Sequence, residues 1–245
     1  MLLGVKLLTA HLAGDYLVQT DRMAREKRRP RVLALHMLVH AALVGLVVLT
    51  EPCRPALIVV AAIVLGSHAA IDAWTSRIEP RGLRVLVLDQ SLHVLAIGAA
   101  LAAAGGPWIP PGLSGAAFAP RPWLVVCGAI VAVPAGATFN GRWIRPFREA
   151  LSNESRAQQQ GLERAGWWIG ILERMLVYVA ILAGIESLVG FVIAVKAVLR
   201  LPEAREKWSR ELAEYYLVGS LASLAWALTC ALAVRGILRR LPGAG

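Results

Sequence analysis

The sequence contains little cysteine, and the thiols that it has are scattered. Its 245 residues include three cysteines, Cys53, Cys127 and Cys230, and no CxxC spacing. This pattern gives no support to a thiolate zinc site or to a redox pair. A GxSxG nucleophile elbow and a GxxxxGK[ST] phosphate loop are also missing, so serine-nucleophile and P-loop chemistry are not indicated.

Acidic residues are scarce as well. The chain has 16 Asp and Glu against 26 Lys and Arg, which gives a formal net charge of +10. In a soluble protein such an excess would suggest nucleic-acid binding. Here the basic residues gather in short segments between apolar runs, which is the positive-inside pattern of membrane proteins. The charge distribution therefore predicts contact with membrane lipids and no nucleic-acid partner.

Hydrophobic residues make up 57% of the chain. They lie in runs of roughly 20 residues, the length that a helix needs to cross ~30 Å of hydrocarbon. Helices satisfy their own backbone hydrogen bonds and so can cross lipid. We therefore predict an all-α fold, a polytopic transmembrane helical bundle of about seven or eight spans. The expected spans are 2–19, 32–50, 56–76, 85–104, 123–139, 167–185 and 212–234, and 187–199 either spans or re-enters.

The loops predict an orientation and a division of the chain. Basic residues are dense between 22 and 31, which predicts a cytoplasmic loop and an N-terminus outside. The Gly- and Pro-rich stretch 105–122 predicts an outer loop. It separates a four-span half, 1–104, from a second transmembrane half, 123–245, which includes the polar inner segment 141–166.

Ionisable residues recur in the first four predicted spans. Such groups are costly in lipid and usually face a bundle interior. Each span carries a pair spaced i, i+4, which places both members on one helix face. The eight residues are His11, Asp15, His36, His40, His68, Asp72, Asp89 and His93. Because neighbouring spans are antiparallel, we expect two layers: His11, His40, His68 and His93 lie deeper, and Asp15, His36, Asp72 and Asp89 lie nearer the cytoplasm.

Imidazole and carboxylate groups are the ligands expected for zinc, iron or manganese. Four-helix bundles build such sites from facing helices. We therefore predict a divalent transition metal, with zinc favoured and iron or manganese as alternatives. All eight residues are candidate ligands, and Asp15, Asp72 and Asp89 are also candidate catalytic bases. A metal-free polar network or a proton relay would use the same groups.

A different set of charges lies in the second half, near the predicted cytoplasmic ends of the helices. The set is Glu173, Arg174, Lys196 and Glu214. One interpretation is that these residues pair with one another or extend toward lipid phosphates. The other is that Arg174 and Lys196 hold an anionic group of a substrate.

Several stretches carry a resemblance to a known family. Residues 11–21, with Met23, Ala24, Lys27 and His36, resemble a bacterial inner-membrane family described as a domain of unknown function (number 3307). The stretches 166–174, 190–200 and 214–223 are similar to the same proteins. The resemblance implies a multi-pass protein of the bacterial inner (plasma) membrane and no activity. The placement of His and Asp on apolar helices is similar in architecture to membrane-bound metal-dependent hydrolases, although their arginine–threonine–histidine opening is missing.

These patterns favour an integral membrane metalloprotein, a metal-dependent hydrolase that acts on a small, lipid-linked or anionic substrate from the cytoplasmic side. A cation transporter or metal sensor would use the same groups, and a scaffold with a metal-free polar core is a third alternative. Transport needs a polar path on both sides of the site. The segments 41–49, 56–65 and 94–104 have no ionisable residue, which favours an inward-facing pocket.

Overall fold

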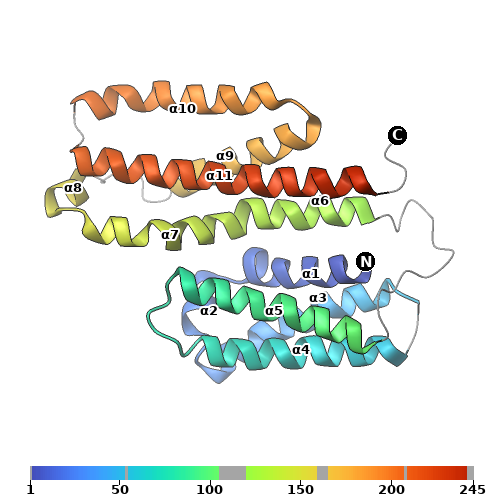
Figure 1. Cartoon of the computed structure of the whole chain (residues 1–245). Helices are drawn as coiled ribbons and strands as arrows, with labels where there is room; N and C mark the ends of the chain where they lie inside the picture. The colour runs from blue at the N-terminus through green and yellow to red at the C-terminus, as the bar shows by residue number, and fades with distance from the viewer. Residues whose placement is uncertain (1, 53–54, 105–119, 159–164, 207–208, 242–245) are drawn as a thin grey trace. The chain divides into compact units, whose positions relative to one another are not determined.

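The computed structural model describes residues 2–52, 55–104, 120–158, 165–206 and 209–241, and all regular elements in these ranges are helical. The order is α1 (Leu2–Ala13), η1 (Gly14–Val18), α2 (Asp21–Glu26), α3 (Pro30–Leu49), α4 (Pro55–Thr75), α5 (Leu83–Ala103), α6 (Pro120–Ile130), η3 (Val131–Ala135), α7 (Gly136–Ala150), α8 (Asn153–Gln158), α9 (Ala165–Ala183), α10 (Glu186–Glu206) and α11 (Arg210–Arg240) (Figure 1). The chain forms two compact units, residues 1–130 and 131–245. Most of the predicted outer loop, 105–119, lies outside the described residues.

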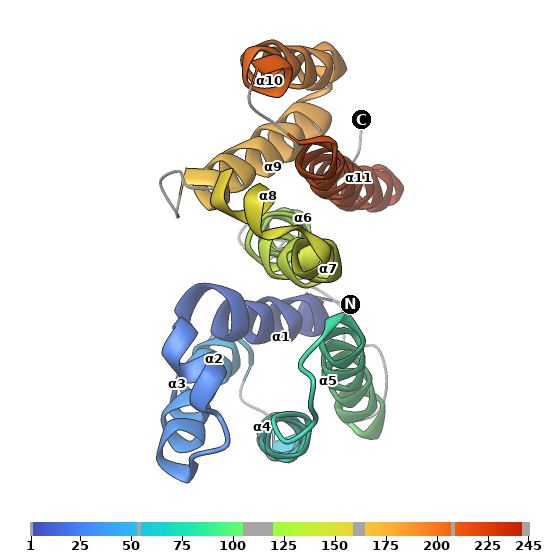
Figure 2. The same ribbon diagram turned by 90° about the vertical axis from the view of Figure 1, so that its left-hand side faces the viewer.

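The first unit is built on four helices that pack in a ring. Contacts join α1 to α3, α3 to α4, α4 to α5, and α5 back to α1, and α6 covers α1. Figure 2 shows α1, α3, α4 and α5 around a common centre. Local signals set the turn before α3: Thr20 caps α2 by accepting a hydrogen bond from the Met23 N–H, at 3.2 Å, and Pro30 stands in the first turn of α3. Proline fits there because its missing N–H would have no helical partner.

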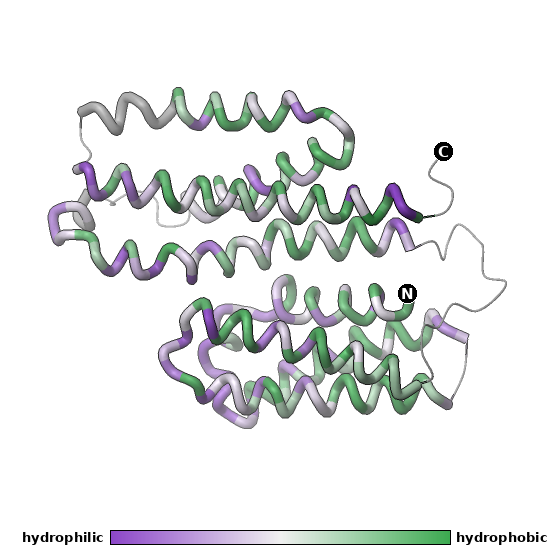
Figure 3. The backbone as a smooth tube through the Cα atoms, in the orientation of Figure 1, coloured by the Kyte–Doolittle hydropathy of each residue, from purple (hydrophilic) through white to green (hydrophobic). Residues whose placement is uncertain are grey.

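An apolar core fills one half of this ring. In α1 and α4 the core residues come before the histidine in sequence, and in α3 and α5 they come after it. The core residues are Leu3, Leu7, Ala10, Val44, Val47, Leu57, Val60, Val64, Ile97 and Ala100. Because neighbouring helices are antiparallel, this core lies on the side of the histidines away from segments 19–29 and 76–82. Figure 3 shows hydrophobic residues along the helices and hydrophilic residues in the segments that join them.

The second unit packs α9 against α10 and α11, and α11 also contacts α7 and η3. Gly184 ends α9 with a φ of 75°, a left-handed conformation that glycine adopts without a steric penalty. The Ile185 N–H then donates to the carbonyl of Ala180 at 2.9 Å, a common helix C-terminal motif. The turn separates α9 from α10.

Within the described residues, six helical segments are long and apolar enough to cross a membrane: 30–49, 55–75, 83–103, 120–150, 166–183 and 210–240. The predicted count of seven or eight is not confirmed. The continuous helix of α1 and η1 covers only residues 2–18, and α10 is not among the segments of sufficient length and hydropathy. The helix that contains the expected span 123–139 is longer than that span and covers residues 120–150. Helix continues through η3, which holds Pro134, to Ala150, so part of the predicted polar segment 141–166 extends this helix.

Gly136 leaves room for Trp226 in the second unit. A Cβ on Gly136 would lie 2.7 Å from the Trp226 ring, whose Nε1 donates to the carbonyl of Val131 at 2.9 Å. We expect Gly136→Ala to lower the free energy of unfolding by about 1–3 kcal/mol, the usual cost of overpacking. Gly141→Ala is the control, because nothing lies within 4 Å of its added Cβ. Reversible unfolding in detergent measures both variants, and equal losses would contradict the packing role.

Candidate metal centre

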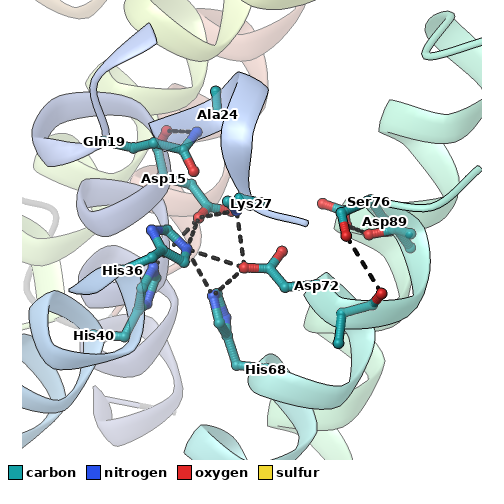
Figure 4. Close-up of polar contacts among 12 residues, drawn as sticks. Asp15, Gln19, Ala24, Lys27, His36, His40, His68, Asp72, Ser76 and Asp89 are labelled. Carbon is teal, nitrogen blue, oxygen red and sulfur yellow. Dashed lines mark hydrogen bonds and ion pairs between the residues drawn. The ribbon is translucent and has the colours of Figure 1, made fainter. Parts of the chain in front are cut away.

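Asp15 lies at the centre of a buried polar cluster in the first unit. It stands in η1, a π-helical segment that follows α1, and π-helical turns are frequent at functional sites. Its Oδ1 lies 3.2 Å from His36 Nε2 and 3.3 Å from His40 Nε2. His36 Nε2 in turn lies 3.2 Å from His68 Nε2. Figure 4 shows these side chains pointing toward one another from different helices.

A second carboxylate borders this group. Asp72 Oδ2 lies 3.1 Å from His36 Nε2 and 3.3 Å from His68 Nε2. Lys27 Nζ donates to the same oxygen at 2.8 Å and lies 3.8 Å from Asp15 Oδ1. The ammonium therefore lies between two buried carboxylates and offsets part of their charge (Figure 4).

The other histidines are oriented by α5. The Nδ1 of His93 lies 2.8 Å from the backbone carbonyl of Asp89, and because a carbonyl only accepts, Nδ1 carries the proton. The Nε2 of His93 therefore keeps its lone pair, and it is buried without a hydrogen-bond partner. His11 Nε2 donates to Gln90 Oε1 at 3.3 Å. The same amide donates to Asp15 Oδ2 and Asp89 Oδ2, each at 3.0 Å.

All five histidines of the chain gather in this cluster. The ring centroids of His40 and His68 are 3.8 Å apart, those of His68 and His93 are 4.3 Å apart, and those of His11 and His93 are 4.6 Å apart. The rings come from α1, α3, α4 and α5, and each histidine is 3% exposed or less. The four helices thus bring all five imidazoles into one cluster.

Gly14 permits the approach of His40. A Cβ on Gly14 would overlap the His40 imidazole. Only glycine leaves the backbone of η1 open to the ring, so the residue before Asp15 is part of the site geometry. By contrast, a Cβ on Gly45, in the same helix as His40, meets nothing within 4 Å.

Among the residues that the structure describes, two sets of side chains have a spacing that could hold a metal ion. Asp15, His36, His40 and His68 each offer one ligand atom, and these atoms lie within 4.8 Å of one another. His11, His68 and His93 form a second set and share His68 with the first. Tetrahedral zinc, with bonds of about 2.0–2.1 Å, holds its ligands about 3.3–3.4 Å apart. Three of the six distances within the first set are 3.2, 3.3 and 3.2 Å, and all six are within 4.8 Å.

Six of the eight predicted candidates belong to a set that could hold a metal ion, and the other two are their neighbours. Of the eight, Asp72 and Asp89 lie outside both ligand sets. Asp72 contacts the first set through His36 and His68. Asp89 accepts from Thr75 Oγ1 at 2.6 Å and from Gln90, so it lies in the hydrogen-bonding surroundings that orient His93 and Asp15.

Sequence reasoning did not assign Lys27, Thr75 or Gln90 to the site. Lys27 lies in a basic segment, where its charge is indistinguishable from those of its neighbours. Gln90 follows Asp89 directly, and an amide in an apolar run indicates an interhelical hydrogen bond, so this residue type could have been included with the charges. Thr75 stands one residue before the end of the predicted third span, 56–76, and carries no charge.

The charged candidates of the second unit are only partly brought together. Lys196 Nζ pairs with Glu173 Oε2 at 2.6 Å. Arg174, 4% exposed, donates to Ser223 Oγ at 2.8 Å and to the carbonyl of Val133 at 3.1 Å. Glu214 pairs with Arg210 on the surface at 2.9 Å, apart from the other three.

Lys27 is expected to stabilise the cluster electrostatically. Breaking a buried ion pair costs about 3–5 kcal/mol, so Lys27→Met should lower the free energy of unfolding by about 3 kcal/mol in EDTA. Arg22→Met is the control, because Arg22 is 78% exposed in its pair with Glu26 and exposed pairs contribute about 0–1 kcal/mol. Thermal unfolding in detergent compares them, and indistinguishable variants would exclude this role.

Comparison with known proteins adds a family and no activity. Neither the curated proteins nor the solved structures include a match to this chain. The resemblance expected for residues 166–174, 190–200 and 214–223 lies outside the matched range and stays a prediction. Residues 3–106, which hold every side chain of the cluster, match the model of the family described as "Protein of unknown function (DUF3307)".

Proposed function

We propose that this protein is an integral membrane metalloprotein of the bacterial inner membrane. Its first unit binds a divalent transition metal through Asp15, His36, His40 and His68, with zinc favoured. One observation carries the proposal: the buried Asp15 Oδ1 and His40 Nε2 lie 3.3 Å apart, but their angles are not those of a hydrogen bond, and neither atom has a hydrogen-bond partner among the described residues. Ligand atoms converge in this way when they point at a common ion instead of at one another.

A metal-free polar network explains the same atoms less well. In such a network each imidazole N–H would donate to a carboxylate, because a buried polar group without a partner costs about 1–3 kcal/mol. Asp15 Oδ1, His40 Nε2 and His93 Nε2 are all left without a hydrogen bond. A cation would satisfy lone pairs that lack a donor.

The location supports access from the cytoplasm. Segments 19–29 and 76–82, at the Asp15 end of the bundle, carry Lys27, Arg28 and Arg81, and basic loops favour the inner side. Arg28 donates to the carbonyl of Ser76 at 2.7 Å, and Arg81 donates to the carbonyl of Ala24 at 2.8 Å, which joins the two segments. The apolar core closes the opposite half of the ring. If the basic segments lie on the inner side, the start of α1, at the other end of the bundle, lies outside.

The chemistry that we propose is metal-dependent hydrolysis of a lipid-linked or small anionic substrate. A bound metal lowers the pKa of a coordinated water and polarises the bond to be cleaved. A catalytic zinc keeps one position for that water, so a hydrolytic metal would be held by three of these four residues, and the water would take the fourth position. Asp72 is the proposed general base, because its Oδ2 borders His36 and His68. The cationic Lys27 attracts the anionic substrate.

Cation transport is disfavoured by the apolar core. An ion that left the histidines toward the apolar core would meet side chains such as Leu7, Val44 and Val60, which are 1%, 2% and 2% exposed. Lys6, also buried on this side, is itself a cation and pairs with Glu51 at 2.6 Å. The apolar side chains offer no ligand, and an unsolvated ion in hydrocarbon is strongly unfavourable.

The metal is tested by elemental analysis of protein purified in detergent and loaded with zinc. We expect about one or two equivalents in the wild type, because the two ligand sets share His68, and less than a tenth of that in the His40→Ala, His68→Ala double variant. Asp21→Asn, an exposed change nearby, should keep the metal. Wild-type protein without metal, or a double variant that retains it fully, would overturn the assignment.

Gly14→Ala tests the geometry without removing a ligand. The added methyl displaces the His40 ring, so zinc affinity should fall by about a hundredfold, the upper end of losses seen when ligand orientation is disturbed. Gly45→Ala makes the same change in α3 in open space and should bind zinc as the wild type does. Competition with a chromogenic chelator measures both, and the proposed geometry predicts that they differ.

Hydrolysis is tested with the phosphodiester bis(4-nitrophenyl) phosphate and zinc-loaded protein in micelles. Asp72→Asn should retain zinc, because Asp72 lies outside the ligand sets, and should lose about a hundredfold in rate, within the usual range for a general base. No zinc-dependent release by the wild type would contradict phosphodiester hydrolysis. Entry of zinc into protein-containing vesicles, followed with an enclosed dye, would support transport in its place.

A further inference from the structure

A pocket lies within the second unit, between α9, α10 and α11. Its volume is about 370 Å³, within the range of about 300–1,000 Å³ that is typical of small-molecule sites. Most of its wall is apolar and includes Val177, Val192, Ile193, Leu217, Leu221 and Leu224. A hydrocarbon chain is the ligand that such a wall accommodates best.

The wall also carries charge. Of the described residues that line the pocket, three are charged: Glu173, Arg174 and Lys196. Glu173 pairs with Lys196. Arg174 donates to a hydroxyl and a backbone carbonyl, which are neutral. One carboxylate against two cations leaves one positive charge, so the pocket favours an anion.

The pocket reaches an apolar surface. Ile193, Leu217 and Leu221 line it and are nevertheless 45%, 59% and 56% exposed. Phe191 and Val198 on α10 are also exposed, at 64% and 65%. Exposed apolar side chains of this size are stable against lipid, so a ligand would enter from the hydrocarbon and not from water.

We infer that this pocket binds an anionic lipid, with an alkyl chain along α10 and α11 and an acidic head group held by Arg174 and Lys196. The apolar wall selects the chain, and the excess positive charge selects the head group. Arg174 is suited to this role because its guanidinium is held in place by Ser223 and Val133. The site is separate from the metal centre, and lipid binding can be measured in chelator.

Native mass spectrometry in a neutral detergent tests the site with phosphatidylglycerol, which is anionic, and phosphatidylcholine, which is zwitterionic. The wild type should bind one phosphatidylglycerol at least tenfold more tightly than phosphatidylcholine. Ala197→Phe fills the pocket from an exposed position of its wall and should abolish this binding. Ala194→Phe is the control, because Ala194 is exposed on the same helix and does not line the pocket.

The head-group contact is tested by Lys196→Gln, which should weaken phosphatidylglycerol binding by about tenfold, as expected for loss of a charge-assisted contact. Arg235→Gln removes another paired cation of the same unit, one that bonds Glu186 at 2.5 Å outside the pocket, and should bind as the wild type does. Equal affinity for both lipids, or equal losses in Ala197→Phe and Ala194→Phe, would overturn the inference. Inorganic phosphate that bound as tightly as the lipid would overturn the role of the chain.

Discussion

The structure of the first unit depends on the cost of burying carboxylates in an apolar bundle. Asp15 and Asp72 are 7% and 2% exposed, and an isolated charge at such a position is strongly unfavourable. Each therefore contacts imidazoles, at least one of them from another helix, and lies near Lys27. These contacts join η1, α3 and α4, and Gln90 adds α5 by donating to Asp15. A bound cation would offset the same charges more completely.

Both units place a polar site beside an irregular helix. In the first unit the π-helical η1 carries Gly14 and Asp15, and the absent side chain of Gly14 admits His40. In the second, η3 surrounds Pro134, and carbonyls of this segment accept hydrogen bonds from Trp226 and Arg174. A π-helical turn changes which backbone groups are paired, and so it can supply acceptors to a buried donor. In both units, residues of a proposed site thus lie beside an interruption of the regular helix.

Much of this arrangement follows from the sequence, with clear exceptions. Pairs spaced i, i+4 in antiparallel helices must meet when their depths match, as His40 and His68 do. Helix ends were harder to predict: the helix that begins at Pro120 continues to Ala150, because the polar residues after 139 lie on one face and do not interrupt it. Glu214 faces Arg210 instead of Lys196, since its rotation on α11 turns it outward.

The sequence by itself determined the helical class, the apolar runs and the gathering of histidines on inward faces, because each follows from residue spacing along a single helix. Only the tertiary structure decided which groups touch. It placed Lys27 between Asp15 and Asp72, and it inserted Gln90 between His11 and Asp15. It also kept Asp89 apart from the ligand sets. These partners depend on the rotation of each helix about its axis and on the path of the joining segments, and neither is encoded in the period of a single helix.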